Sequence, residues 1–200
     1  MRRVFLIIIF LVLGSGCATT TPKSPLEDKI VLPRTGNFEQ KTGIYKNNEI
    51  GFKLWFPSGY DVWTEESVLK KWEKQERLKG GSLFLAINER EAIWVFGMGL
   101  KLSMELNDFV YLWKASLDPS LKETSTKEKQ TGGVKYIELI YTGLMKDPSL
   151  YKEIDTTNHL NCIDLRDYKV IIVFTTLTRS YNQRKIDQIN EIVNSFEQTR

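Results

Sequence analysis

Histidine and cysteine are scarce in this sequence: one histidine and two cysteines occur among 200 residues. His159 would have to serve any Ser-His-Asp or Cys-His arrangement, and no cluster with familiar metal-ligand spacing accompanies it. His159 and Cys162 alternate onto opposite faces of a predicted strand, so the two side chains cannot share a site. We therefore predict a protein that is not an enzyme, with no catalytic residues, no metal and no cofactor.

The glycine pattern of a nucleotide-binding loop is also missing. Gly97 and Gly99 lie in the stretch FGMGLK, which lacks the third glycine and the strand-to-helix context of a dinucleotide loop. We interpret both residues as strand glycines that permit a bulge or a close contact. The carboxylates are scattered among lysines, and their spacing indicates no catalytic pair.

Long apolar runs are absent as well, but a short one opens the chain. Arg2 and Arg3 precede the apolar residues 4–13, and the small residues 14–16 follow. This order is typical of a signal peptide, and the run is too short for a membrane span, which needs about 20 apolar residues. We predict a signal peptide over residues 1–16.

Cys17 directly follows the predicted signal peptide and resembles the acylated cysteine of bacterial lipoproteins. In that family the thiol takes a diacylglycerol, and an aliphatic residue stands three places earlier, where this chain has Gly14 preceded by Leu13. The resemblance implies a lipid anchor at Cys17, because two or more acyl chains hold a protein stably on a membrane. It also implies a domain that faces the periplasm. Because Ala18 replaces the aspartate that retains lipoproteins in the inner membrane of diderm bacteria, outer-membrane attachment is expected.

The region after Cys17 is rich in threonine, proline, serine and charge. Pro22, Pro25 and Pro33 disfavour regular structure there, so we predict a lipidated, flexible tether over residues 17–37. Such a chain has an end-to-end distance of about 25 Å. We expect residues 38–200 to form a single domain.

Charge and cysteine content restrict the partners of that domain. Loss of residues 1–16 removes two arginines and lowers the formal net charge from +3 to +1, which argues against a nucleic-acid partner. A lipidated sulfur cannot form a disulfide, so Cys162 would have no partner within the chain. We predict that Cys162 is a buried, inert thiol.

Alternation of apolar and polar residues predicts strands over most of the predicted domain. Short turns containing Asn, Gly or Asp join these strands into hairpins, which predicts an antiparallel sheet. The predicted hairpins pair residues 44–45 with 52–56, 82–87 with 92–102, 122–130 with 134–143, and 156–165 with 168–177.

Two segments show the three- and four-residue spacing of amphipathic helices. The first covers residues 107–119, with Asn107 as a cap and a proline at its end. The second covers residues 180–198 and opens with a capping box of Ser180 and Gln183. Their predicted core positions are Phe109, Leu112, Trp113 and Leu117 in the first helix and Ile186, Ile189, Val193 and Phe196 in the second.

Two parts of the chain resemble the PsbP-like family, which is named after an extrinsic subunit of the oxygen-evolving photosystem. Gly51 and Phe52 open a strand that runs to Pro57 and then to Trp63, and near the C-terminus an apolar strand leads to a helix ending at residues 195–196. The resemblance implies an α+β fold with an antiparallel sheet between helices, an α/β/α sandwich shared with a Ran-binding nuclear import factor. It also implies binding, because family members with known roles mostly bind or help assemble other proteins.

These observations favour a non-catalytic, lipid-anchored protein-binding or assembly module of the bacterial cell envelope. The alternative is a carrier or sensor that holds a small apolar ligand between sheet and helix. Trp55, Trp63, Trp94 and Trp113 could line such a pocket, although buried aromatic residues more often form plain core. An enclosed pocket would favour the carrier, and a solid core with an exposed apolar patch would favour the binder.

Residues 64–79 form a third, weaker helix candidate and carry the predicted binding surface. Basic residues outnumber glutamates in the second half of this segment, and an aromatic side chain lies among them. We predict a basic helix that docks an acidic partner protein or anionic lipid head groups. The alternative is a solvated amphipathic helix whose apolar side packs on the sheet. The candidate partner-binding residues are Lys70, Lys71, Trp72, Lys74 and Arg77.

Overall fold

The computed structural model describes residue 33 and residues 35–65, 68–69, 81–117, 119–147 and 152–199. The predicted signal peptide, Cys17 and most of the predicted tether lie outside these ranges. The same is true of the candidate partner-binding residues Lys70, Lys71, Trp72, Lys74 and Arg77.

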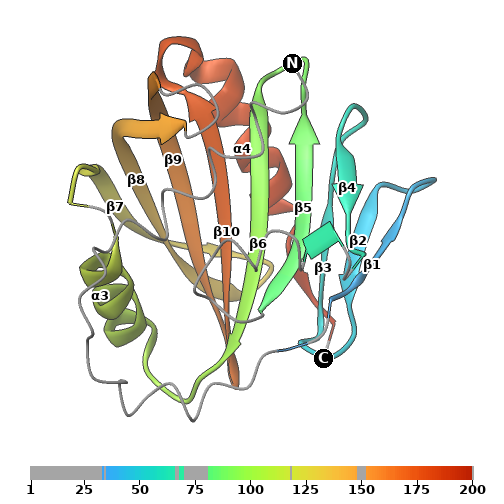
Figure 1. Cartoon of the computed structure of the whole chain (residues 1–200). Coiled ribbons are helices and arrows are strands. Elements are labelled where there is room, and N and C mark those ends of the chain that lie inside the picture. The colour runs from blue at the N-terminus through green and yellow to red at the C-terminus, as the bar shows by residue number, and fades with distance from the viewer. Residues whose placement is uncertain are drawn as a thin grey trace.

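A seven-stranded antiparallel sheet forms the centre of the molecule, with the strand order β4-β5-β6-β10-β9-β8-β7 (Figure 1). Three of the predicted hairpins, β5–β6, β7–β8 and β9–β10, are confirmed as neighbouring strands of this sheet. The strands are β4 (Asp61–Trp63), β5 (Ser82–Asn88), β6 (Ile93–Lys101), β7 (Lys122–Thr131), β8 (Val134–Asp147), β9 (Lys152–Leu165) and β10 (Tyr168–Leu177).

The fourth predicted hairpin belongs to a second, smaller sheet with the order β1-β2-β3-β11. Its β2–β3 turn is closed by the Ile50 N–H, which donates to Asn47 Oδ1 at 2.9 Å. The sequence analysis predicted one sheet, because turn chemistry identifies neighbouring strands but not which hairpins join one another. Here β3 pairs with the C-terminal β11 and not with β4. The four strands are β1 (Asn37–Glu39), β2 (Ile44–Asn47), β3 (Phe52–Trp55) and β11 (Glu197–Gln198).

Both predicted helices are confirmed, but their caps differ from the prediction. α3 (Leu106–Ser116) has Glu105 at its N-cap position with no side-chain cap bond, so Asn107 is a helical residue. α4 (Gln183–Asn194) is capped by Asn182, whose side chain accepts from the Lys185 N–H. The predicted cap Ser180 instead ends the short 3-10 helix η3 (Thr178–Ser180), because its hydroxyl donates to the Leu177 carbonyl.

The inner faces of the helices also differ in part from the predicted spacing. Leu112 was a predicted core position, but 45% of its surface is exposed, and the neighbouring Val110 is buried in its place. Ile186 is only partly buried, whereas Ile192 is fully buried. The three- and four-residue spacing identifies an apolar stripe, and the angle at which the helix lies on the sheet decides which edge of that stripe is covered.

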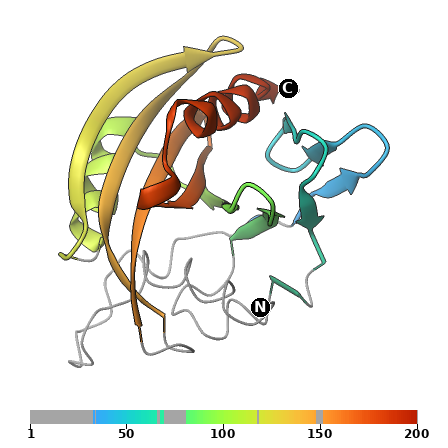
Figure 2. The ribbon, with the colours of Figure 1, turned by 90° about the horizontal axis from the view of Figure 1, so that it is seen from above.

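In the described part of the chain, α3 packs on one face of the large sheet and α4 on the other, so the predicted α/β/α architecture is confirmed. Figure 2 shows α3 and α4 on opposite sides of β9 and β10. We call the two sides the α3 face and the α4 face. Buried residues of the α3 face include Phe109, Trp113, Leu139, Leu160 and Cys162. Buried residues of the α4 face include Phe52 from the small sheet, with Ile163, Phe174, Ile189 and Val193.

The predicted close contact at the strand glycines is confirmed. A Cβ atom added to Gly97 on β6 would lie 2.3 Å from Cε1 of Phe84 on β5. A Cβ atom on Gly99 would lie 2.8 Å from Cδ1 of Ile50. The missing side chains of these glycines therefore leave room for the apolar side chains of Phe84 and Ile50, which pack on the α4 face of the sheet.

Candidate functional site

An open groove lies between the β1–β2 turn and the loop that follows β3. Its volume is about 570 Å³, and we call it the aromatic groove. Its apolar lining comes from Phe38, Trp55, Phe56, Pro57 and Tyr60. Exposed polar residues surround this lining, namely Gln40, Lys41, Thr42, Ser58 and Asp61.

Phe56 connects the aromatic groove to the buried core. Its side chain is only 2% exposed. Its ring centroid lies 6.2 Å from that of Phe38, 5.7 Å from that of Tyr60 and 5.4 Å from that of Phe84. Tilted and edge-to-face ring pairs of this kind are favourable. The lining of the groove is therefore held by the core beneath it.

The backbone around Trp55 is fixed from two sides. The Trp55 N–H donates to Ser195 Oγ at 2.9 Å, and the Phe56 N–H donates to the Gly43 carbonyl at 2.8 Å. Gly43 has a φ of 71°, and a Cβ atom there would lie 2.5 Å from the Phe56 carbonyl oxygen. Glycine is required at this position because the β1–β2 turn must approach the backbone of β3 closely.

Tyr60 lines the aromatic groove and carries an unpaired polar group. Its hydroxyl oxygen is buried and has no hydrogen-bond partner among the described residues. Burial raises the pKa of Tyr60, and the negative charges of Glu91 and Glu191 raise it further. The phenol is therefore neutral near pH 7, and its buried hydroxyl donates to none of the described residues.

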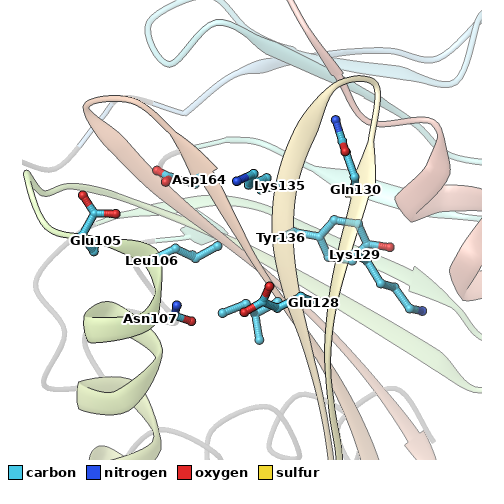
Figure 3. Close-up of a pocket in the computed structure, with 10 residues that line it drawn as sticks. Glu105, Leu106, Asn107, Glu128, Lys129, Gln130, Lys135, Tyr136 and Asp164 are labelled. Carbon is cyan, nitrogen blue, oxygen red and sulfur yellow. The ribbon is translucent and has the colours of Figure 1, made fainter.

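A second open groove, of about 530 Å³, lies between the start of α3 and the ends of β7, β8 and β9. Figure 3 shows Glu105, Leu106 and Asn107 on one side of it and Glu128, Lys135 and Asp164 across from them. Charges of both signs lie close together there. Asp164 is already paired, since the buried Lys169 amine donates to its Oδ1 at 2.7 Å. This groove has no single sign of charge that would select a partner.

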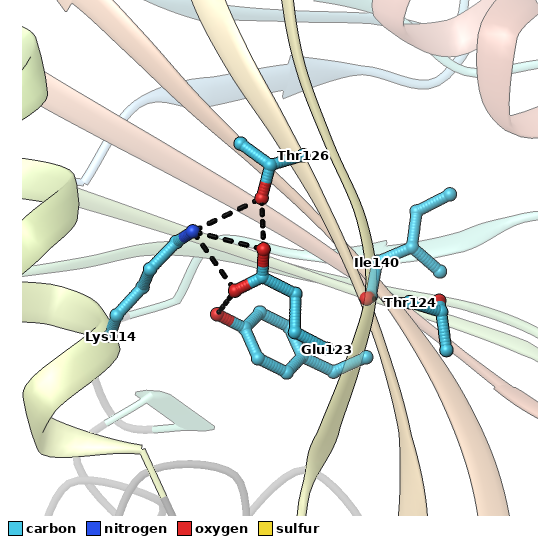
Figure 4. A network of polar contacts seen from close by, with 6 residues as sticks. Lys114, Glu123, Thr124, Thr126 and Ile140 are labelled. Atoms are coloured by element: carbon cyan, nitrogen blue, oxygen red, sulfur yellow. Dashed lines mark hydrogen bonds and ion pairs between the residues drawn. The ribbon is translucent and has the colours of Figure 1, made fainter.

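A polar network at the last turn of α3 fastens this helix to β7 and β8 (Figure 4). Lys114 Nζ lies 2.9 Å from Glu123 Oε2, and the Tyr141 hydroxyl donates to the same oxygen at 3.0 Å. The Thr126 hydroxyl donates to Glu123 Oε1. Partial burial acts to raise the pKa of Glu123, but the hydrogen bonds and the Lys114 charge outweigh it, so the pKa is lowered. All the donors in this network are used within the chain, which indicates a structural role.

His159 lies on the α4 face, is 2% exposed and contacts the Tyr181 hydroxyl through Nε2. Its Nδ1 lies 3.9 Å from Glu138 Oε1, and that oxygen accepts from Lys129 Nζ at 2.8 Å. Burial lowers the pKa of His159 to about 4, although the Glu138 charge acts in the opposite direction. The imidazole is therefore neutral near pH 7. His159 therefore belongs to a buried polar cluster with Tyr181 and Glu138.

Cys162 points to the α3 face, away from His159, as the strand alternation predicted. It is fully buried, and burial raises the pKa of its thiol to about 12. The prediction of a buried thiol is confirmed. Among the described residues, no group of three or more His, Cys, Asp or Glu side chains is arranged to hold a metal ion.

The four tryptophans of the alternative hypothesis do not surround one space. Trp94 and Trp113 belong to the buried cluster of the α3 face, and Trp63 packs against that cluster. Trp55 lines the aromatic groove on the other side of the sheet. The sequence analysis did not find this groove, because its lining comes from separate parts of the chain. These parts are the residues before β2, the last residue of β3 and the residues that follow β3. The signal that could have found it is the aromatic pair Trp55 and Tyr60 on either side of a Pro-Ser-Gly turn.

Comparison with known proteins connects this chain to a fold and not to a named family. No family model and no curated protein matches the sequence. The solution structure of the cyanobacterial PsbP protein CyanoP from Synechocystis sp. PCC 6803 matches with a TM-score of 0.53 and 11% identity. The match covers 92% of this chain and 98% of CyanoP. The chain therefore has a PsbP-like fold.

Two further bacterial structures are similar at lower TM-scores. One, from Bacteroides thetaiotaomicron, has a TM-score of 0.49 and 12% identity. The match covers 74% of this chain but only 45% of that chain, so this protein spans less than half of that relative's length. The other is PA94 from Pseudomonas aeruginosa, a protein of unknown function, with a TM-score of 0.43, 10% identity, and coverage of 80% and 94%.

None of the helices in the described part of the chain is both long enough and apolar enough to cross a membrane.

Proposed function

We propose that this protein is a non-catalytic, lipid-anchored protein-binding or assembly module of the bacterial cell envelope. Cys17 carries the acyl chains in this proposal, and residues 17–37 hold the domain away from the membrane surface. The basic residues of segment 64–79 provide one contact with the partner protein. The aromatic groove provides a second contact.

The observation that carries the proposal is the aromatic groove itself. Phe38, Trp55 and Tyr60 present partly exposed rings, and polar residues surround them. Binding energy at protein interfaces is concentrated in aromatic anchors of this kind, enclosed by a polar rim. Trp94 and Trp113 are committed to the core, which favours recognition at the surface over an apolar ligand held inside.

Site-specific photocrosslinking in the native envelope tests the proposal. A photoreactive residue at Gln40, on the rim of the groove, is compared with one at Lys127, which is exposed on β7 at the far edge of the large sheet. We expect one envelope protein to be crosslinked reproducibly from Gln40 and not from Lys127. Crosslinking from Gln40 should also weaken when Cys17→Ser releases the protein from the membrane.

Two outcomes would contradict the proposal. Equal crosslinking from both positions would show that the groove has no specific partner. A small apolar molecule retained by the purified protein in native mass spectrometry would instead identify a carrier.

A further inference from the structure

We propose that the free edge of β7 binds an extended, acidic segment of another protein as an additional strand of the large sheet. β7 and β4 are the two outermost strands of this sheet. Asp61, the first residue of β4, lines the aromatic groove, so the β7 edge is a second surface at the other end of the sheet. Binding at the β7 edge does not depend on the groove.

No described strand pairs with the outer side of β7. Figure 2 shows the yellow β7–β8 hairpin at the outer edge of the curved sheet. The register between β7 and β8 shifts between Glu123 and Ser125, so regular pairing is available over residues 125–131, a length of about 24 Å. Such an edge presents unpaired backbone N–H and C=O groups, to which an extended segment can add as a strand.

The hairpin geometry shows which backbone groups of β7 point outward. Gly132 and Gly133 join β7 to β8, and both have positive φ, as the favoured two-residue hairpin turn requires. Thr131 and Val134 close this turn as a hydrogen-bonded pair, and bonded and non-bonded pairs alternate along an antiparallel ladder. The residues whose N–H and C=O groups point away from β8 are therefore Thr126, Glu128 and Gln130.

The side chains of β7 select the charge of the incoming segment. Lys127 is exposed on the α4 face and has no ion-pair partner among the described residues. Lys129 lies on the same face, with its Nζ 2.8 Å from Glu138 Oε1. Opposite charges directly across a strand pair are favourable, and like charges are unfavourable. Acidic side chains are therefore favoured on the α4 face of the segment, where they recur at every second position.

The same charges disfavour a second copy of this chain as the occupant. The outward backbone groups occur only at even-numbered positions, so an antiparallel copy must align even positions with even and odd with odd. The central alignments place Lys127 opposite Lys127 or Lys129 of the copy, and one of them also places Glu128 opposite Glu128. Lysines on an edge strand protect it from self-association in this way, and here they leave the edge open to an acidic segment.

Amide exchange of the full chain in the presence of a synthetic peptide tests the proposal. The probe is a decapeptide in which glutamate alternates with threonine, and the control peptide has lysine in place of glutamate. With the glutamate peptide at about ten times its dissociation constant, exchange at the Thr126, Glu128 and Gln130 N–H groups should slow by about tenfold. Exchange at Phe38, on the edge strand β1, should not change. Residue-resolved NMR measures these rates.

Two substitutions separate binding from folding. Glu128→Pro removes an outward N–H that β8 does not use, so the sheet should stay folded while peptide binding is lost. Its matched control, Glu128→Thr, keeps the N–H and should retain binding. Lys127→Glu should exchange the preference, so that this variant binds the lysine peptide and not the glutamate peptide. Thermal unfolding verifies the fold of each variant, and if Glu128→Pro unfolds, the exchanged preference of Lys127→Glu decides.

Three results would overturn the proposal: no slowing by the glutamate peptide, equal slowing by both peptides, or unchanged binding by a folded Glu128→Pro variant. In the native envelope, a photoreactive residue at Lys127 should capture a protein other than the one captured from Gln40. Capture from Gln40 alone would show that the β7 edge has no partner there, and it would leave the proposed function of the groove intact.

Discussion

The hydroxyl of Tyr181 contacts Nε2 of His159, and this contact joins the residue before the α4 cap to the middle of β9. On the other side of the ring, His159 Nδ1 lies 3.9 Å from Glu138 Oε1, and Lys129 forms an ion pair with Glu138. The imidazole is neutral in the folded protein, with its pKa lowered from 6.5 to about 4 by burial.

Stability should therefore depend on pH between 6.5 and 4. The unfolded chain binds a proton on His159 near pH 6.5, whereas the folded chain binds it only near pH 4. Stability is fully present above pH 6.5 and decreases as the pH falls toward 4, by up to about 3 kcal/mol. Urea unfolding at pH 7 and pH 4.5 measures the loss. His159→Gln should flatten this dependence, and an unchanged pH slope in that variant would assign the effect to other groups.

Gly97→Ala should destabilise the domain by about 1–3 kcal/mol, because the added methyl group would overlap the Phe84 ring. Thermal unfolding followed by circular dichroism measures the change. Phe84→Leu in the Gly97→Ala background should recover part of the loss, since a smaller side chain leaves room for the methyl group. Additive effects of the two substitutions would show that this contact is not the cause.

The Asp164–Lys169 pair should respond unequally to removal of its two members. Lys169 is 2% exposed and Asp164 is 33% exposed. Asp164→Ala leaves a buried ammonium group without its counter-charge and should cost about 3 kcal/mol or more, whereas Lys169→Met removes the buried charge and should cost much less. Chemical denaturation of both variants tests this asymmetry. Equal losses would contradict it.

Cys17→Ser should prevent acylation. We expect the wild-type protein to partition into the detergent phase and to carry acyl mass on Cys17, and the variant to remain unprocessed or soluble. Phase partitioning and intact-mass measurement provide the readout. A wild-type protein without acyl mass on Cys17 would remove the basis for a lipid anchor.

Charge reversal of Lys70, Lys71 and Lys74 to glutamate should abolish binding to the partner protein or to anionic vesicles. Exposed charges contribute little to folding, so the melting temperature should change little. Pull-down of the crosslinked partner and vesicle co-sedimentation distinguish the two ligands. Unchanged binding by a well-folded triple variant would show that the interface lies on another face of the domain.

The sequence alone determined most of the local elements of this fold, but not the short strands β1, β4 and β11, the last of which lies inside the predicted second helix. Alternation and turn residues located the hairpins, three- and four-residue spacing located both helices, and the opposite orientations of His159 and Cys162 followed from the two-residue period of a strand. These features depend on neighbours along the chain, so they can be recognised without the tertiary structure. The PsbP-like resemblance added the correct layer order.

Tertiary structure decided how those elements combine. The pairing of β3 with β11 joins residues more than 140 positions apart, and no local pattern specifies such a pairing. Burial of Val110 in place of Leu112 depends on how α3 lies on the sheet. The aromatic groove likewise exists only because the β1–β2 turn is brought against the loop after β3, where the Phe56 N–H donates to the Gly43 carbonyl. Local sequence sets what each segment can form, and long-range packing sets which surfaces those segments share.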